Sequence, residues 1–261
     1  MAGVIVVTGA ARGMGRACVE RLRSAADHLV AADLVAPDIE GTIGVACDVS
    51  DPAAIDALAA QVRDLGAFRA LVHVAGISPT MGTPRQIFAV DLVGTQLLLD
   101  AFEPLVAPGA AAVCFASSSA YQVPLFMPDP ALDAFVADPS ADGFLDQVEE
   151  RFDDSGLAYG WAKRGVVLAA ERAAVAWGPR GGRVVSVSPG LIETDMGRQE
   201  MANQPAMQGI LDATPLARFG DPDELAAVVE FLVSDQASFV SGVDFLVDGG
   251  SVAGLKGLMA G

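Results

Sequence analysis

The sequence predicts an α/β fold in which helices cover both faces of one doubly wound parallel sheet, and three observations support this prediction. Short apolar runs rich in β-branched residues alternate with segments of helical periodicity along most of the chain. A glycine-rich turn joins the first run to the first helical segment. The chain has 261 residues, 52% of them hydrophobic, with neither repeats nor a linker, so we expect one domain over residues 1–261.

The strands and helices are expected in regular alternation through the first half of the chain. Apolar runs predict the strands, whereas 3.6-residue periodicity predicts the helices. Asp51 and Pro52 suit the N-cap and the first position of a helix. The expected strands are 4–8, 28–32, 45–48, 70–75 and 111–116, and the expected helices are 14–26, 52–65 and 85–102.

The alternation breaks at residues 121–156, which contain four prolines, nine acidic residues and one basic residue. We interpret this segment as an insertion with one or two short helices, placed between the fifth strand and a long helix. The long helix is expected over 157–177, followed by a strand over 183–187, a helix over 222–234 and a last strand over 244–247. Residues 191–215 are expected to be a loop.

The charge balance excludes several classes of partner. Thirty-three acidic and sixteen basic residues give a formal net charge of −17. Such a surface repels phosphate backbones and anionic headgroups, so we expect no nucleic-acid partner and no membrane partner. Cys18, Cys47 and Cys114 are widely spaced, which argues against a disulfide framework or a metal site. With no signal-peptide pattern at the N-terminus, we expect a cytoplasmic protein.

The glycine-rich turn predicts a dinucleotide site of the Rossmann type. Glycines there permit a tight turn and close approach to a pyrophosphate, and the following helix presents free N–H groups to the phosphates. Asp33 ends the second expected strand, where a carboxylate accepts hydrogen bonds from ribose hydroxyls and repels a 2′-phosphate. We therefore expect NAD rather than NADP, although Arg12 favours the phosphate. The expected contacts here are Gly9, Arg12, Gly13, Met14, Gly15, Asp33 and, beside the adenine, Asp48 and Val49.

Tyr159 and Lys163 open the long helix and are four residues apart, so both side chains share one face. A phenol has an ordinary pKa of about 10 and is a poor base at neutral pH. A nearby ammonium group lowers that pKa. The pair therefore suits acid/base catalysis.

With these motifs in place, the chain resembles the short-chain dehydrogenase/reductase family over nearly its whole length. The resemblance is carried by T-G-A-A-R-G-M-G at 8–15, V-A-G at 74–76, Y-G-W-A-K at 159–163, P-G at 189–190 and V-D-G-G at 247–250. It implies that Tyr159 is the general acid/base, that Lys163 binds the nicotinamide ribose, and that Ser118 orients the substrate oxygen. It further implies cofactor contacts from Ala75, Gly76, Tyr159, Lys163, Pro189, Gly190, Ile192 and Thr194.

Two positions depart from the family pattern. His73 begins a His-Val-Ala-Gly sequence where the family has Asn-Asn-Ala-Gly, and we expect a packed structural histidine. Asp91 replaces the helix asparagine that supports a proton relay to the lysine. A carboxylate can accept a hydrogen bond or pair with Lys163, but it cannot donate as an amide does. Asp91 is therefore included among the expected catalytic residues.

Ser118 and Tyr159 are 41 residues apart, a long separation that resembles the 3α-hydroxysteroid dehydrogenase/carbonyl reductase branch. This implies an NAD-dependent oxidoreductase that interconverts a secondary alcohol and a ketone on a bulky apolar substrate. An apolar pocket is expected from Leu125, Phe126, Met127, Met196 and Met201.

The alternative is a non-catalytic NAD(H)-binding sensor or scaffold, which the intact Ser118, Tyr159 and Lys163 disfavour. A homodimer or homotetramer is expected. The insertion either caps the substrate site or covers the helical face through which relatives assemble, and we favour the second.

Overall fold

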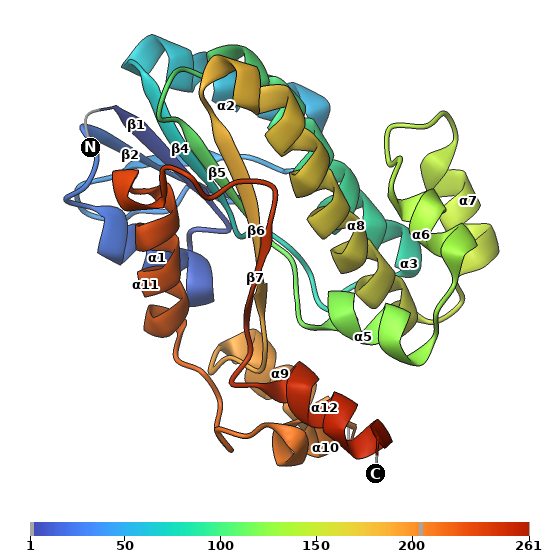
Figure 1. Ribbon diagram of the computed structural model, residues 1–261. Coiled ribbons are helices and arrows are strands. Elements are labelled where there is room, and N and C mark those ends of the chain that lie inside the picture. Colours follow the sequence, from blue (N-terminus) through green and yellow to red (C-terminus); the bar gives the residue numbers. More distant parts are fainter. Residues whose placement is uncertain (1–2, 204–205, 261) are drawn as a thin grey trace.

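A seven-stranded parallel sheet runs through the computed structural model, which describes residues 3–203 and 206–260 (Figure 1). The strand order β3-β2-β1-β4-β5-β6-β7 confirms the doubly wound fold. Because the order reverses between β1 and β4, a crevice is expected at the carboxyl ends of those two strands. The strands are β1 Val4–Thr8, β2 His28–Asp33, β3 Ile43–Ala46, β4 Phe68–His73, β5 Ala111–Phe115, β6 Arg183–Pro189 and β7 Asp244–Val247.

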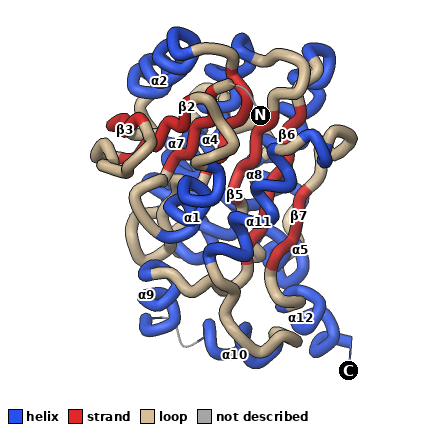
Figure 2. Tube along the Cα trace, turned by 90° about the vertical axis from the view of Figure 1, so that its left-hand side faces the viewer, coloured by secondary structure: helices blue, strands red, loops and turns tan. Residues whose placement is uncertain are grey.

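Helices cover both faces of the sheet and create two apolar cores (Figures 1 and 2). Helices α1 (Gly13–Leu22) and α11 (Pro222–Val233) pack on one face, and α2 (Pro52–Leu65), α4 (Gly94–Phe102) and α8 (Ser155–Trp177) on the other. Successive side chains of a strand point to opposite faces. On β1, Val4 and Val6 therefore enter one core, whereas Ile5 and Val7 enter the other.

Several boundaries differ from the sequence prediction. The first helix, expected over 14–26, ends at Leu22. β3 and β4 each begin two residues earlier than expected. The single helix expected over 85–102 is divided into α3 (Pro84–Ile87), a π-helical turn (Phe88–Val93) and α4. A π-helical turn has no distinct apolar period, so the sequence pattern does not reveal it.

The carboxyl ends of the strands carry helices, two of them within residues 191–215, which were expected to be a loop. Helices α9 (Asp195–Asn203) and α10 (Ala206–Ala213) occupy much of segment 191–215, and α12 (Ser251–Ala260) lies beside them at the bottom of Figure 1. Each of these helices contains glycine, a weak helix former, so local propensity does not predict them.

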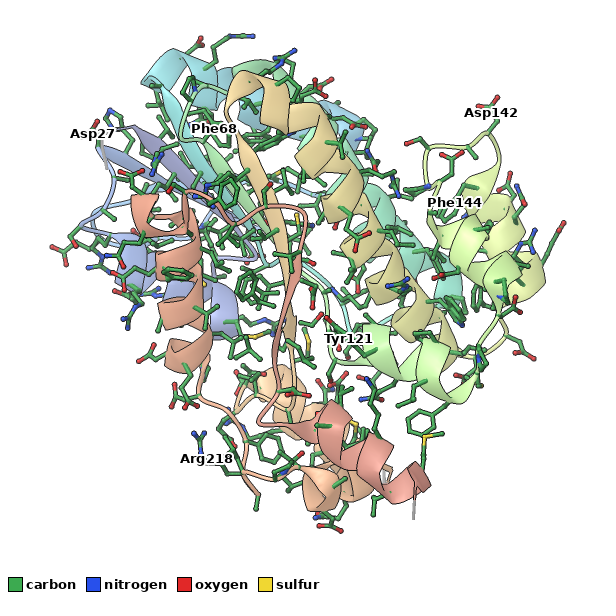
Figure 3. The ribbon with its side chains drawn as sticks, in the orientation of Figure 1. Asp27, Phe68, Tyr121, Asp142, Phe144 and Arg218 are labelled. Atoms are coloured by element: carbon green, nitrogen blue, oxygen red, sulfur yellow. The ribbon has the colours of Figure 1, made fainter. Side chains whose placement is uncertain are left out.

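The insertion contains two complete helices and most of a third, rather than the one or two short helices expected. They are α5 (Ser119–Phe126), α6 (Pro130–Val136) and α7 (Phe144–Arg151). A cluster of four phenylalanines joins α6 and α7 to the π-helical turn, with ring centroids 5.1 Å apart for Phe88 and Phe152 and 4.5 Å apart for Phe135 and Phe144 (Figure 3). The insertion therefore packs beside the turn that carries Asp91.

No helix of the described ranges has the length and apolar character needed to cross a membrane.

Candidate active site

A cavity of about 460 Å³ lies at the carboxyl ends of the strands, where the strand order reverses. Its walls come from the glycine-rich turn, the ends of β2, β4 and β5, and the starts of α8 and α9. The structure brings together most of the expected cofactor contacts here: Gly9, Arg12, Gly13, Met14, Gly15, Asp33, Asp48, Val49, Ala75, Gly76, Tyr159, Lys163 and Thr194.

The glycine-rich turn leaves space that side chains would fill. Gly9 has φ +66°, and a Cβ there would lie 2.7 Å from the Ala75 nitrogen. A Cβ on Gly15 would collide with the Gly9 carbonyl oxygen. The turn therefore brings bare backbone to the N-terminus of α1, where free N–H groups and the helix dipole favour an anion. These residues fit the pyrophosphate of a dinucleotide.

Asp33 is held against this turn by two backbone groups. Its Oδ2 accepts a hydrogen bond from the Ala11 N–H at 2.9 Å, and its Oδ1 accepts one from the Leu34 N–H at 2.8 Å. The Asp33 carboxylate therefore has a fixed position on the cavity wall, directly beside the glycine-rich turn. Leu34 also lines the cavity, a contact that sequence reasoning missed.

Tyr159 and Lys163 lie at the other end of the cavity, on the first turns of α8. The Lys163 Nζ is 5.6 Å from the centre of the Tyr159 ring. The same Nζ donates to the Phe115 carbonyl oxygen at 3.1 Å. Burial raises the pKa of the Tyr159 phenol, and the Glu200 and Asp91 carboxylates raise it further, whereas a hydrogen bond with Ser117 lowers it.

Ser117, rather than the expected Ser118, makes the side-chain contact with Tyr159. Ser118 is buried, and its N–H donates to the Pro189 carbonyl oxygen at 2.8 Å. Neither Ser117 nor Ser118 lines the cavity, so the contact with the Tyr159 phenol is what distinguishes the two serines. Two-residue strand alternation, continued past β5, favours Ser118 over its neighbours, but that strand ends at Phe115 and the chain then turns into α5.

Asp91 lies beneath the cavity wall, in the π-helical turn. Its Oδ1 accepts from the Ile77 N–H at 2.8 Å, and its Oδ2 lies 3.3 Å from the Lys163 Nζ. Burial raises the pKa of the Asp91 carboxyl, and both Lys163 and the Ile77 N–H oppose that rise. Widened turns of this kind often occur at functional sites. Here the turn brings the carboxylate into direct contact with the ammonium group.

His73 is buried and connects two threonines. Its Nδ1 is 2.8 Å from the Thr8 Oγ1, and its Nε2 is 3.0 Å from the Thr95 Oγ1. Thr95 donates its own proton to the Asp91 carbonyl oxygen at 2.6 Å, so Nε2 carries the imidazole proton and Nδ1 accepts from Thr8. Burial lowers the pKa of His73 to about 3, and the Lys163 charge adds to this. The histidine is therefore a neutral structural bridge between β1, β4 and α4.

Three further expected contacts lie behind the cavity surface. Pro189 ends β6 and accepts from Ser118, while Ile192 is buried and pairs with Gly220. Gly190 passes so close to Asp248 that a Cβ would lie 2.6 Å from its Cα. Sequence reasoning missed Ile77, Val90 and Phe115, which line the cavity. Their apolar side chains resemble ordinary core residues, so only the fold places them here.

The expected apolar pocket is not formed as described. Of its five residues, Met196 lines the cavity, whereas Phe126 and Met127 are exposed. Leu125 lines a separate cavity together with Tyr121, which is labelled in Figure 3, and Met201 lines neither cavity. No group of three or more His, Cys, Asp or Glu side chains in the described ranges is arranged to hold a metal ion.

A dinucleotide cradle at one end of the cavity and a Tyr–Lys pair at the other define a nucleotide-dependent enzyme of the α/β class. The model of a family described as enoyl-(acyl carrier protein) reductase matches residues 9–128 and 146–252. The chain belongs to the short-chain dehydrogenase/reductase family. It is accordingly an oxidoreductase with a nicotinamide cofactor site.

Individual relatives agree with this assignment. The chain is 29% identical over 252 residues to the 3-alpha-hydroxysteroid dehydrogenase/carbonyl reductase of Comamonas testosteroni, covering 95% of both proteins. It is 30% identical to the D-threitol dehydrogenase of Mycolicibacterium smegmatis, covering 95% of this chain and 92% of that protein. The 3-alpha-hydroxysteroid dehydrogenase of Pseudomonas sp. B-0831, solved with NADH, has a TM-score of 0.82 at 30% identity, with 98% of each chain covered.

Proposed function

We propose that this protein interconverts a secondary alcohol and a ketone, using NAD as the hydride acceptor. The observation that carries the proposal is the arrangement of Tyr159 and Lys163 at one end of a cavity whose other end is the glycine-rich cradle, with Ser117 hydrogen-bonded to the Tyr159 phenol. The cavity therefore has a place for a dinucleotide and, next to it, groups that can move a proton and hold an oxygen.

The proton is moved by Tyr159 in this proposal. During oxidation of the alcohol the phenolate takes the hydroxyl proton, and during reduction of the ketone the phenol returns it. The bound nicotinamide supplies or accepts the hydride at the substrate carbon. Ser117 donates a hydrogen bond to the substrate oxygen, and Lys163 lowers the pKa of the phenol and holds the ribose. Asp91 and the Phe115 carbonyl keep the Lys163 ammonium in place.

Asp33 supports the choice of NAD over NADP. Its carboxylate is fixed on the cavity wall by the N–H groups of Ala11 and Leu34. A negative group in that position accepts from ribose hydroxyls and repels a 2′-phosphate. Arg12, which also lines the cavity, would favour the phosphate. We expect the repulsion between the Asp33 carboxylate and a 2′-phosphate to outweigh the attraction from Arg12, because the carboxylate is fixed within a confined site.

The names of the relatives support two substrate classes for this site. One relative is named a hydroxysteroid dehydrogenase, consistent with the bulky apolar ring expected from the sequence. Others are named D-threitol dehydrogenase and meso-2,3-butanediol dehydrogenase, whose substrates carry several hydroxyl groups. We propose a secondary alcohol as the common feature of both.

The test is Tyr159→Phe, with turnover of NAD and secondary alcohols measured beside NADH binding. We expect turnover to fall by about 10²- to 10⁴-fold, because the general acid/base is removed. NADH affinity should stay within about threefold, since the glycine-rich cradle is unchanged. Near-normal turnover would refute the proposed role of Tyr159. NADH binding without turnover in the unmodified protein, on a broad panel of alcohols and ketones, would favour a sensor or scaffold.

We also propose a cytoplasmic location and a homodimer or homotetramer. Cys18, Cys47 and Cys114 are free and buried, which suits a reducing compartment.

A further inference from the structure

The insertion, residues 121–156, packs against the π-helical turn that carries Asp91. Phe88 begins that turn and is completely buried. Its ring centroid lies 5.1 Å from that of Phe152 and 5.8 Å from that of Phe144, two buried rings that belong to the insertion. The position of the turn therefore depends on aromatic contacts with the insertion.

The insertion also packs on α8, directly after the buried lysine of the site. The Arg164 Nε donates to the Asp133 Oδ1 of α6 at 2.8 Å. A Cβ on Gly165 would lie 2.5 Å from the Leu92 Cδ2 and 3.0 Å from the Val136 carbonyl oxygen. Helix α6, helix α8 and the π-helical turn thus meet without spare room, immediately beside the two charged side chains of the site.

The contact between Asp91 and Lys163 needs this support. A π-helical turn is an uncommon conformation, so it persists only where the packing around it is favourable. A buried ion pair stabilises a protein only if its geometry is good. Lys163 has a second partner in the Phe115 carbonyl oxygen, whereas Asp91 is positioned by its turn and by the Ile77 N–H. A shift of the turn would therefore move the carboxylate and leave the ammonium group in place.

We propose that Phe152 is a positioning residue, whose ring packs on Phe88 and holds the π-helical turn so that the Asp91 carboxylate contacts the Lys163 ammonium. The insertion accordingly has a role in the active site that differs from capping the substrate and from covering an assembly face. This inference rests on the proposed function, because it concerns the acid/base group of the same site.

The experiment follows ionisation of the Tyr159 phenol directly, through the absorbance of tyrosinate in the NAD-loaded protein. The chain has two tyrosines, so every variant also carries Tyr121→Phe, which leaves Tyr159 to titrate alone. Phe152→Leu should lower the midpoint of the titration by about 0.5 pH unit, toward the small end of the range for coupled neighbours. The Asp91 carboxylate, which disfavours the phenolate, is then no longer held in the site, while Lys163 stays.

The same substitution combined with Asp91→Asn shows whether Phe152 acts through the carboxylate. Without that carboxylate, Phe152→Leu should leave the midpoint unchanged. Phe144→Leu removes a second ring from Phe88 and should repeat this behaviour, so the proposal does not depend on one variant. An equal shift with and without Asp91→Asn, or no shift in either, would overturn the proposal.

Phe68→Leu is the matched control. Phe68 is a buried ring 5.2 Å from that of Phe102, but it begins β4, whereas the cavity lies at the carboxyl end of that strand. Figure 3 shows it well apart from Phe144. Its melting temperature should fall by about as much as that of Phe152→Leu, and the midpoint of Tyr159 should stay in place. An equally large shift in Phe68→Leu would reveal a general loosening of the fold and would also overturn the proposal.

Steady-state oxidation of secondary alcohols separates this inference from the proposed function. The titration needs no alcohol, so the expected midpoints without any turnover would count against the proposed function alone. Turnover together with an unchanged midpoint in Phe152→Leu would count against the role of Phe152 alone.

Discussion

The Asp91 Oδ2 and the Lys163 Nζ lie 3.3 Å apart, and both side chains are almost completely buried. A buried ammonium without a partner is strongly destabilising, so this contact offsets the cost of placing Lys163 beside the phenol. The carboxylate also raises the pKa of Tyr159, the opposite of the effect required from Lys163. The Asp91 carboxylate therefore has two effects: it stabilises the buried Lys163 ammonium, and it raises the pH at which the Tyr159 phenol ionises.

Asp91→Asn should move the rising limb of the pH profile of alcohol oxidation to lower pH, by about one unit. The substitution removes a negative charge near the phenol, and its remaining oxygen can still accept from the Ile77 N–H. The measurement is kcat/KM against pH, with the melting temperature as a control for folding. A limb that stays in place, or moves to higher pH, would contradict this effect of the Asp91 carboxylate.

Ser117→Ala should reduce kcat by about 10²- to 10³-fold, the usual cost of removing a hydrogen-bond donor to a developing oxyanion. Ser118→Ala is the matched control. The Ser118 contact with Pro189 is made by its backbone N–H, so activity should remain near that of the unmodified enzyme. The measurement is the steady-state kcat of both variants. A large loss of kcat in Ser118→Ala and a small one in Ser117→Ala would assign the orienting role to Ser118.

Asp33→Asn should raise the NADPH-to-NADH ratio of kcat/KM by at least about tenfold, because the charge that repels a 2′-phosphate is lost while one oxygen can still accept. Asp38→Asn, at an exposed acid on the segment after β2, controls for the loss of one negative charge. Steady-state kinetics with both cofactors provide the test. An unchanged ratio in Asp33→Asn would show that another group sets the preference.

His73→Leu should destabilise the fold by about 1–3 kcal/mol, because the buried Thr8 hydroxyl loses the acceptor of its proton. The Thr95 hydroxyl keeps its hydrogen bond to the Asp91 carbonyl oxygen. The substitution should also flatten the pH dependence of stability. The pKa of His73 is about 3 in the folded protein and about 6.5 when unfolded, so the unfolded chain binds the extra proton between these values. Stability from this group is therefore complete above the unfolded pKa and falls as pH drops toward 3.

Denaturant unfolding at pH 7 and pH 4.5 measures both effects. His73→Gln is the second variant, because its amide places polar groups between the Thr8 and Thr95 hydroxyls but does not titrate. Both variants should lose less stability than the unmodified protein between the two pH values. An identical loss in all three would exclude titration of His73.

The sequence predicted the strands, their parallel order and the cofactor end of the site, because these depend on short-range patterns. Apolar runs define strands such as β1, and the glycine spacing at 9–15 is a local backbone requirement. Asp33 follows from its position at the end of β2. The four-residue spacing of Tyr159 and Lys163 needs only one helix.

Tertiary structure decided which side chains meet across separate elements. The π-helical turn that brings Asp91 to Lys163 and the register that presents Ser117 instead of Ser118 each join residues from different parts of the chain. The phenylalanines of the insertion resemble any other core residues until they pack on Phe88. Side-chain direction in such regions is determined by packing between elements, which no local period in the sequence records.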